Sequence, residues 1–245
     1  MFQTPFNEGV VGRAIRNDLI EIVIHDIRTY SKDPHKRVDD YPYGGGPGML
    51  MRPEPLFDAI ETAKKRSMMS PQTPIILMTP QGRRLNHKIV HELSYHDELS
   101  IICGRYEGFD ARVRIELATD EISIGDFVIS GGELAAMTII DSVTRILPGV
   151  LGTSESPTND SFYEGLLQFP QFTRPPTYRN LTVPDILLSG NHSQINKWRR
   201  MQSLQRTAER RPELLENVSL TEEEMDFIGD ILNTEIQGCE KTPDP

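Results

Sequence analysis

Two glycine-rich turns contain residue types that suit the binding of a small molecule. Gly104–Gly108 reads G-R-Y-E-G, and Gly131–Gly132 lies in S-G-G-E. The turns follow two apolar, β-branched runs, Leu99–Cys103 and Ile122–Ile129, which predict buried strands. Glycine lets the backbone approach a ligand without a Cβ in the way, and ligands of α/β sheets bind beyond the carboxyl ends of the strands. The two turns therefore predict one small-molecule site built largely of backbone.

Other familiar site motifs fail on sequence or spacing. Neither turn has the G-x-G-x-x-G pattern, and the glycine-rich stretch Tyr41–Met49 lacks the G-K-[ST] of a P-loop. That stretch is either a loop against which a phosphate or nucleotide lies or a flexible surface turn. His91 and His96 are one residue too far apart for an H-E-x-x-H zinc site, and His87 with His91 lacks a third ligand. We predict exposed helix histidines, no metal site, and a core position for Cys103.

Two charged residues are notable for their positions. Arg145 lies near the end of a helical stretch with an apolar face, beside the predicted site. Asp160 lies in the small, polar segment Gly152–Gly165, which could carry a carboxylate over a cleft. From position alone the ordinary explanations are favoured for both residues: Arg145 as a cation at a helix C-terminus, and Asp160 as a solubilising charge in a linker.

Charge is distributed unevenly along the chain. The net charge of −10 argues mildly against a nucleic-acid binder. Residues 174–211, however, set eight basic residues against only Asp185 and Glu209; the basic ones are Arg174, Arg179, Lys197, Arg199, Arg200, Arg206, Arg210 and Arg211. This block is either a footprint for a polyanion or a solvated helix face. Trp198 within it could stack on a base, although a core position is the more usual one for tryptophan.

The elements that must position these residues alternate between strand and helix. Besides the strands before the two turns, strands are predicted at Leu19–Ile24 and Pro74–Thr79, and helices at Val10–Asn17, Pro53–Lys65, Asn86–Tyr95 and Gly132–Leu147. This alternation predicts an α/β fold with a mostly parallel sheet. The polar and glycine-rich stretch Arg28–Gly48 is interpreted as a long functional loop.

A change in composition predicts two domains. Residues 152–165 read as a linker between an α/β domain, residues 1–151, and a helical domain, residues 166–245. In the helical domain, Asn191–Arg210 is a basic amphipathic helix, and the capping-box pair Thr221 and Glu224 begins a last helix that runs to about Ile236. The chain has no apolar run near the roughly 20 residues that cross a bilayer, no signal-peptide pattern and only two cysteines, so we expect a cytoplasmic protein.

Longer strings of the sequence occur in the order found in one bacterial enzyme family. They are V-D-D-Y-P-Y-G-G-G-P-G-M, T-P-Q-G-R, C-G-R-Y-E-G-F-D-x-R-V, S-I-G-D-F-V-I-S-G-G-E-L-A-A-M, D-S-V-T-R-I-L-P-G-V-L-G, D-S-F-Y-E-G-L-L, P-x-x-L-L-S-G-N-H and R-R-P-E-L-L. From about Gly9 to the last helix, the chain resembles the bacterial tRNA (guanine-N1)-methyltransferases of the TrmD family. The resemblance implies a SPOUT-class fold, in which a deep trefoil knot ties the sheet, with a small all-α C-terminal domain.

The resemblance also implies a function. The chain would be a homodimeric enzyme that uses S-adenosylmethionine to methylate N1 of the guanosine 3′ of the anticodon, position 37 of tRNA, with no DNA or membrane partner. Asp160 would take the N1 proton as general base, and the Arg145 guanidinium would stabilise charge on O6. Family activity is associated with Mg²⁺, for which Glu107 is a candidate contact without a dedicated cage.

The remaining site residues also follow from the resemblance. The cofactor contacts would be Pro80, Gly104, Tyr106, Glu107, Ile124, Gly125, Asp126, Phe127, Val128, Ile129, Gly131 and Gly132. The tRNA contacts would be Gly44, Gly45, Gly46, Arg174, Lys197, Arg199 and Arg200.

The chain departs from the family pattern in two places. A short strand of the I-x-x-L-F-P type usually precedes the M-F with which this sequence begins, and Ala135 stands where proline is frequent. The first departure leaves open a catalytically impaired tRNA-binding homologue. A knotted methyltransferase of another RNA is the other alternative, although the C-terminal S-G-N-H and R-R-P-E-L-L strings disfavour it. The second departure predicts only a local change where the helix begins.

Overall fold

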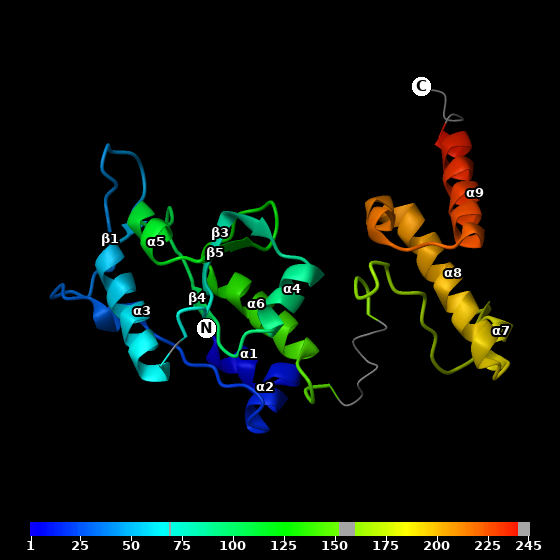
Figure 1. The fold of residues 1–245 in the computed structure, drawn as a ribbon, viewed down its shortest axis with the longest axis horizontal. Coiled ribbons are helices and arrows are strands. Elements are labelled where there is room, and N and C mark those ends of the chain that lie inside the picture. The colour runs from blue at the N-terminus through cyan, green and yellow to red at the C-terminus, as the bar shows by residue number, and fades with distance from the viewer. Residues whose placement is uncertain (69, 152–159, 240–245) are drawn as a thin grey trace. The chain divides into compact units, whose positions relative to one another are not determined.

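A computed structural model describes residues 1–68, 70–151 and 160–239 (Figure 1). The chain divides into two compact units, residues 1–154 and 155–245, and each is described by itself. Most of the predicted linker, residues 152–159, lies outside the described residues.

Unit 1 contains the parallel sheet that the alternation of strands and helices predicts. Its strand order is β4 (Ser100–Ile102), β3 (Ile75–Arg84) and β5 (Asp120–Ser123), and both pairs are parallel. Helix α4 (His87–Ser94) connects β3 to its neighbour β4, and α5 (Ala111–Glu116) lies in the crossover from β4 to β5 on the other side of β3, as parallel strands require. The carboxyl ends of β4 and β5 therefore lie at the same edge of the sheet.

The other elements of unit 1 surround this sheet. They are α1 (Gln3–Asn7), α2 (Gly9–Arg16), the 3₁₀ helix η1 (Ile27–Tyr30), the antiparallel pair β1 (Asp39–Asp40) and β2 (Leu50–Met51), α3 (Pro53–Ser67) and α6 (Glu133–Ile146). The helices predicted at the positions of α2, α3, α4 and α6 are confirmed. Each observed helix end lies within two residues of the predicted end. The β1–β2 pair joins the two ends of the glycine-rich stretch Tyr41–Met49.

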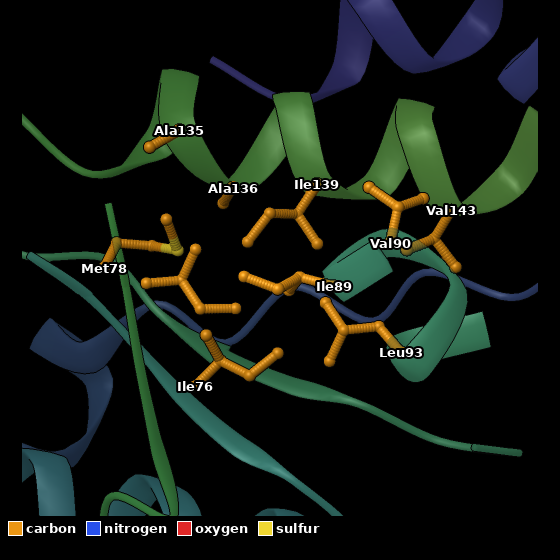
Figure 2. Packing of buried hydrophobic residues seen from close by; sticks show 10 residues of the cluster. Ile76, Met78, Ile89, Val90, Leu93, Ala135, Ala136, Ile139 and Val143 are labelled. Carbon is orange, nitrogen blue, oxygen red and sulfur yellow. The ribbon is translucent and has the colours of Figure 1, made fainter. Parts of the chain in front are cut away.

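The sheet buries a hydrophobic layer on each face. On one face, Ile76 and Ile122 are fully buried against α4 and against Ile139 of α6. Figure 2 shows the Ala135 end of α6 near Met78, and its Val143 end over α4. On the other face Leu77 packs with residues of α3 and α5. This alternation along β3 follows from the two-residue period of a strand, and each fully buried aliphatic side chain contributes about 1.5–3 kcal/mol.

The predicted strand Leu19–Ile24 is wrong. The segment pairs with no strand among the described residues, although five of its six residues are apolar and three are isoleucine. Val23 is 60% exposed and Ile24 is 53% exposed. A strand needs a partner for its backbone N–H and C=O groups, so pattern alone does not produce one.

The second predicted strand, Ile122–Ile129, is confirmed only as far as Ser123. The hydroxyl of Ser123 accepts a hydrogen bond from the Gly125 N–H (3.2 Å) and donates to the Gly125 carbonyl (2.9 Å). The strand pairing ends before Gly125, where the chain turns with a φ of +153°. Residues with a side chain rarely adopt that backbone conformation, so glycine suits this position. Residues 124–129 form a loop, and only Ile124 and Ile129 pack on the core.

Unit 2 is mainly helical in its described part. It contains α7 (Asp185–Leu188), α8 (His192–Arg210), the 3₁₀ helix η2 (Pro212–Asn217) and α9 (Glu222–Cys239). Buried Leu204 and Ala208 of α8 pack with Ile228 of α9 and with Leu166. The two predicted long helices are confirmed, and the capping box is formed reciprocally: the Thr221 N–H donates to Glu224 Oε2 and the Glu224 N–H to Thr221 Oγ1.

A short β-hairpin departs from the all-α expectation for this unit. Strands β6 (Thr177–Tyr178) and β7 (Leu181–Thr182) pair antiparallel. The two residues between them, Arg179 and Asn180, have φ of +50° and +64°, as a type I′ hairpin turn requires. Because the turn contains no glycine, the hairpin was not predicted from the sequence.

Candidate functional site

The two glycine-rich turns lie directly against each other. The Gly132 N–H donates a hydrogen bond of 2.7 Å to the Gly104 carbonyl, and Arg105 and Gly131 form an antiparallel bridge. The Arg105 Nε also donates to Glu133 Oε1 at 2.8 Å. The turns after β4 and β5 thus make one continuous wall at the carboxyl ends of the strands, where α/β proteins bind ligands.

This contact depends on glycine for space rather than for backbone conformation. Gly132 begins α6 with a φ of −73°, which any residue adopts. A Cβ at Gly132, however, would lie 2.9 Å from both the Cys103 Cα and the Gly104 N. A Cβ at Gly104 would lie 2.6 Å from the Phe109 ring. A side chain at Gly132 would push the two turns apart, and one at Gly104 would displace the Phe109 ring. This close packing is the observation on which the candidate site rests.

We expect Gly132→Ala to weaken binding of the small-molecule ligand at least tenfold, because the added methyl group collides with backbone that cannot rotate away. Overpacking of this kind also costs about 1–3 kcal/mol of stability. Isothermal titration with the ligand and thermal unfolding of the full chain measure the two effects.

Gly229→Ala in α9 is the matched control, because a Cβ there meets nothing within 4 Å. It should leave ligand binding unchanged and should stabilise the helix slightly. Unchanged ligand affinity in Gly132→Ala would mean that the contact between the turns does not shape the site.

A third loop attaches to the first turn. The Glu107 N–H donates to the Met49 carbonyl at 3.0 Å, and the Met51 N–H donates to the Gly108 carbonyl at 2.8 Å. Gly48, with a φ of +83°, lies so close to Glu107 that a Cβ would be 2.3 Å from its Cγ. The stretch Tyr41–Met49 is therefore fixed to the candidate site at its carboxyl end.

The tip of this third loop has no such packing. Gly44, Gly45 and Gly46 all have positive φ, and a Cβ at any of them would meet nothing within 4 Å. Glycine suits these three positions because of the backbone conformation and not because space is short. The three residues are exposed.

Apolar side chains from the same loops surround the glycine backbone. Phe127 is 56% exposed, Val128 is 84% exposed, and Tyr106, whose φ is +60°, is 51% exposed. Asp126 forms an exposed ion pair of 3.3 Å with Arg84. The apolar groups provide a surface on which a planar ring can lie, because exposed aromatic side chains offer large contact area at low entropy cost.

Pro80 lies in an irregularity of β3 rather than in a regular strand. Met78 and Arg83 both pair with Ile122, so the four residues between them bulge out of the ladder. Bulges are frequent next to functional sites, and proline is tolerated there because it has no N–H to donate. Met78 also contacts the second turn, since a Cβ at Gly132 would lie 3.1 Å from its Cβ.

Arg145 and Asp160 belong to different units. Arg145 is partly buried in the last turn of α6, and Asp160 is partly buried at the start of the described part of unit 2, where its carbonyl accepts from the Tyr163 N–H at 3.4 Å. Thirteen residues separate Arg145 from Gly132 along α6, a distance of about 20 Å at helical rise. Within one chain, therefore, Arg145 does not lie beside the glycine turns as the sequence suggested.

The four basic site candidates of unit 2 divide into two groups. Lys197 pairs with Glu223 at 2.7 Å and Arg200 with Glu224 at 2.8 Å, so the acidic helix α9 balances their charges. The hydrogen bond from Arg200 also holds the pKa of Glu224 below its usual value. Arg199 instead lies over the Phe169 ring, 5.0 Å from its centroid, and Arg174 is exposed. Arg174 and Arg199 are thus better placed than Lys197 and Arg200 to receive an anion.

The remaining candidate groups have structural roles. Burial raises the pKa of the Cys103 thiol to about 12, which fits the predicted core position and leaves no thiolate near neutral pH. His87 and His91 are half-buried rather than exposed, with 3.1 Å between their Nε2 atoms. In the described part of the chain, no three His, Cys, Asp or Glu side chains gather as a metal site would need.

Two contacts in the site were not predicted from the sequence. The Arg105–Glu133 ion pair connects the two turns, and the Phe109 ring fills the space under Gly104. All three residues stand inside the glycine-rich strings, next to predicted site residues. Only this proximity could have indicated them, because a charged or aromatic residue beside a glycine does not by itself predict a contact.

The chain thus combines a wall of glycine turns at the carboxyl ends of a parallel sheet with a mainly helical unit that carries Arg174 and Arg199. A family model described as tRNA (Guanine-1)-methyltransferase TrmD matches residues 1–217. The chain belongs to this family.

Individual relatives are similar over nearly their whole length. A tRNA (guanine-N(1)-)-methyltransferase of Dehalococcoides mccartyi is 52% identical over 96% of this chain and 94% of its own. Proteins of the same description from Moorella thermoacetica and Geotalea uraniireducens are 50% and 52% identical, over 99% and 94% of this chain and 96% and 92% of their own. Among the described residues, no helix has the length and hydropathy needed to cross a membrane.

Proposed function

We propose that this protein transfers a methyl group from S-adenosylmethionine to N1 of the guanosine 3′ of the anticodon, position 37 of tRNA, to give 1-methylguanosine. The observation that carries the proposal is the packing of Gly132 on Gly104, which brings the two glycine turns of the family motif into one wall. Membership of the methyltransferase family supports the reaction class.

The residues around the turns fit S-adenosylmethionine. A Cβ at Gly104, Gly131 or Gly132 would meet neighbouring protein atoms, so these glycines let the two turns pack into one wall. Tyr106, Phe127 and Val128 add apolar surface for the adenine ring. The expected contacts at Glu107, Ile124, Gly125, Asp126 and Ile129 belong to the same loops, and Pro80 lies in the irregular part of β3. When bound, the cofactor supplies a sulfonium methyl group that is already activated for transfer.

The protein must prepare the acceptor for this transfer. Guanine N1 carries a proton at neutral pH and attacks poorly until the proton leaves, and we assign its removal to the Asp160 carboxylate. As the proton leaves, negative charge grows on O6, where the Arg145 guanidinium would stabilise it. The target base must leave its stack to reach both groups.

The position of Arg145 along α6 favours a shared site. Because about 20 Å of helix separate it from the glycine turns of its own chain, we propose that Arg145 acts on a base held at the turns of a second chain. A homodimer with two-fold symmetry would form two such composite sites. Asp160 would act across the same interface.

We extend the proposal to the features that the family implies elsewhere. The tRNA would contact the Gly44–Gly46 tip and the basic residues of unit 2, Arg174 and Arg199 foremost and Lys197 and Arg200 beside them. We also propose the trefoil knot that the family implies, and a cytoplasmic enzyme without DNA or membrane partners. The described residues around Glu107 do not form a cage for Mg²⁺, so no step is assigned to the ion.

We expect the 245-residue chain to transfer labelled methyl from S-adenosylmethionine to a tRNA transcript with guanosine at positions 36 and 37. Transfer should fall to background when position 37 is adenosine, because adenine N1 carries no proton for the base and there is no O6 to stabilise. Incorporated label is counted after separation of the tRNA.

Equal transfer to both transcripts would place the methyl group elsewhere and would contradict the proposal. Binding of the first transcript without any transfer would instead favour a tRNA-binding homologue, the alternative for which the comparisons give no support.

A further inference from the structure

Unit 2 has a hollow of about 890 Å³ to which the proposed reaction assigns no chemical step, although Arg174 and Arg199 line it. It lies between the segment Phe169–Arg174, the residues around α7, and the first two turns of α8. The α8 residues that line it, His192, Ile195, Trp198 and Arg199, are spaced as one face of a helix requires. We call it the α8 hollow.

The α8 hollow combines flat apolar groups with positive charge. Phe169, Phe172 and Trp198 supply aromatic rings, and Arg174 and Arg199 supply two guanidinium groups. No aspartate or glutamate is among the residues that line it. The lining is therefore complementary to a ligand with a planar ring and a negative charge.

One buried polar atom in the hollow lacks a partner. Arg199 Nε is shielded from solvent and makes no hydrogen bond within the described part of the chain. A buried N–H without an acceptor costs about 1–3 kcal/mol, so such groups normally have a ligand or water to satisfy them. The Arg199 guanidinium is held over the Phe169 ring, which fixes its plane.

We propose that the α8 hollow binds an unstacked nucleotide of the tRNA substrate, with its base on Phe172 and Trp198 and its phosphate at Arg174 and Arg199. The inference rests on the proposed function, because that function makes tRNA the partner. The bound nucleotide differs from the methylated one, whose base belongs at the glycine turns. A second anchored nucleotide would fix the register of the anticodon loop and so select the base that is methylated.

Trp198 is the only tryptophan of the chain and therefore reports directly on this hollow. We expect saturable quenching of its fluorescence when the full chain is titrated with an anticodon stem-loop RNA or with guanosine 5′-monophosphate. Ribose 5-phosphate, which has the charge but no base, should quench far less. The apparent affinity for the stem-loop should weaken about tenfold in Phe172→Leu, because a base stacks on an aromatic face and not on an aliphatic group.

Three variants separate stacking from folding and from chemistry. Phe172 is 48% exposed, so its replacement should not unfold the unit, and Phe172→Tyr should keep the quenching because it keeps the ring. Tyr178→Leu changes an exposed aromatic residue outside the hollow and should have no effect. Asp160→Asn, which the proposed function makes inactive, should quench as the unchanged protein does.

Several outcomes would overturn the proposal. Absent quenching by every nucleotide and RNA in a protein that methylates tRNA would do so, as would equal quenching by ribose 5-phosphate. Trp198 emission that changes with protein concentration alone would mean that a second copy of the chain covers the hollow. If the unchanged protein shows the expected quenching but transfers no methyl group, the result would support nucleotide binding in the hollow and contradict the proposed function.

Discussion

Replacing Asp160 by asparagine is expected to lower kcat for tRNA methylation by about 10²–10⁴-fold, the contribution of a well-placed general base. Asparagine keeps the size and polarity of the side chain but does not accept the N1 proton. Single-turnover transfer with saturating tRNA and S-adenosylmethionine isolates the chemical step, and tRNA affinity should change little.

The pH dependence should distinguish loss of a base from loss of structure. In Asp160→Asn the residual rate should rise with pH, because hydroxide in solution then removes the proton that the carboxylate no longer takes. Asp185→Asn is the control, since Asp185 is an exposed carboxylate of the same unit, in the first turn of α7. A rate for Asp160→Asn within threefold of the unchanged protein would exclude Asp160 as the base.

The sequence predicted the fold best where local pattern and long-range pairing agree. β3 and α6 both have continuous apolar patterns, and both are buried in the same core layer, so their predictions held. The Thr221 and Glu224 capping box needs only residues of its own turn, and it formed as predicted. Leu19–Ile24 failed because a strand depends on a partner that its own residues do not encode.

In the candidate site, too, features that depend on local residues were predicted and features that depend on distant packing were not. The glycine turns were recognised in the sequence as places where a ligand can approach the backbone. In the structure the space beside Gly104 and Gly132 is filled by neighbouring protein atoms, and the 2.7 Å bond shows that these glycines serve contact between the turns. The pairing of Lys197 and Arg200 with α9 was not predictable from α8 alone, because it depends on how two distant helices pack. The α8 hollow was missed for the same reason: Phe172 and Trp198 lie far apart in the sequence.

We expect Arg145→Ala to lower kcat about 10²–10³-fold, the usual loss when one stabilising donor to a developing oxyanion is removed. The helix around it should persist, because Arg145 occupies the last turn of α6, beyond the buried residues Ile139 and Val143. Arg145→Lys should recover part of the rate if charge near O6 is what matters. Single-turnover transfer again measures the chemical step.

A mixture of two impaired proteins would reveal which chain supplies Arg145. Refolding Arg145→Ala together with Gly132→Ala at equal amounts gives half mixed dimers. If Arg145 acts across the interface, one site of each mixed dimer combines intact glycine turns with an intact Arg145, and about a quarter of all sites recover full activity. If Arg145 acts within its own chain, every site of the mixed dimers carries a lesion and activity stays near the average of the two variants. The 20 Å of α6 between Gly132 and Arg145 favours the first result.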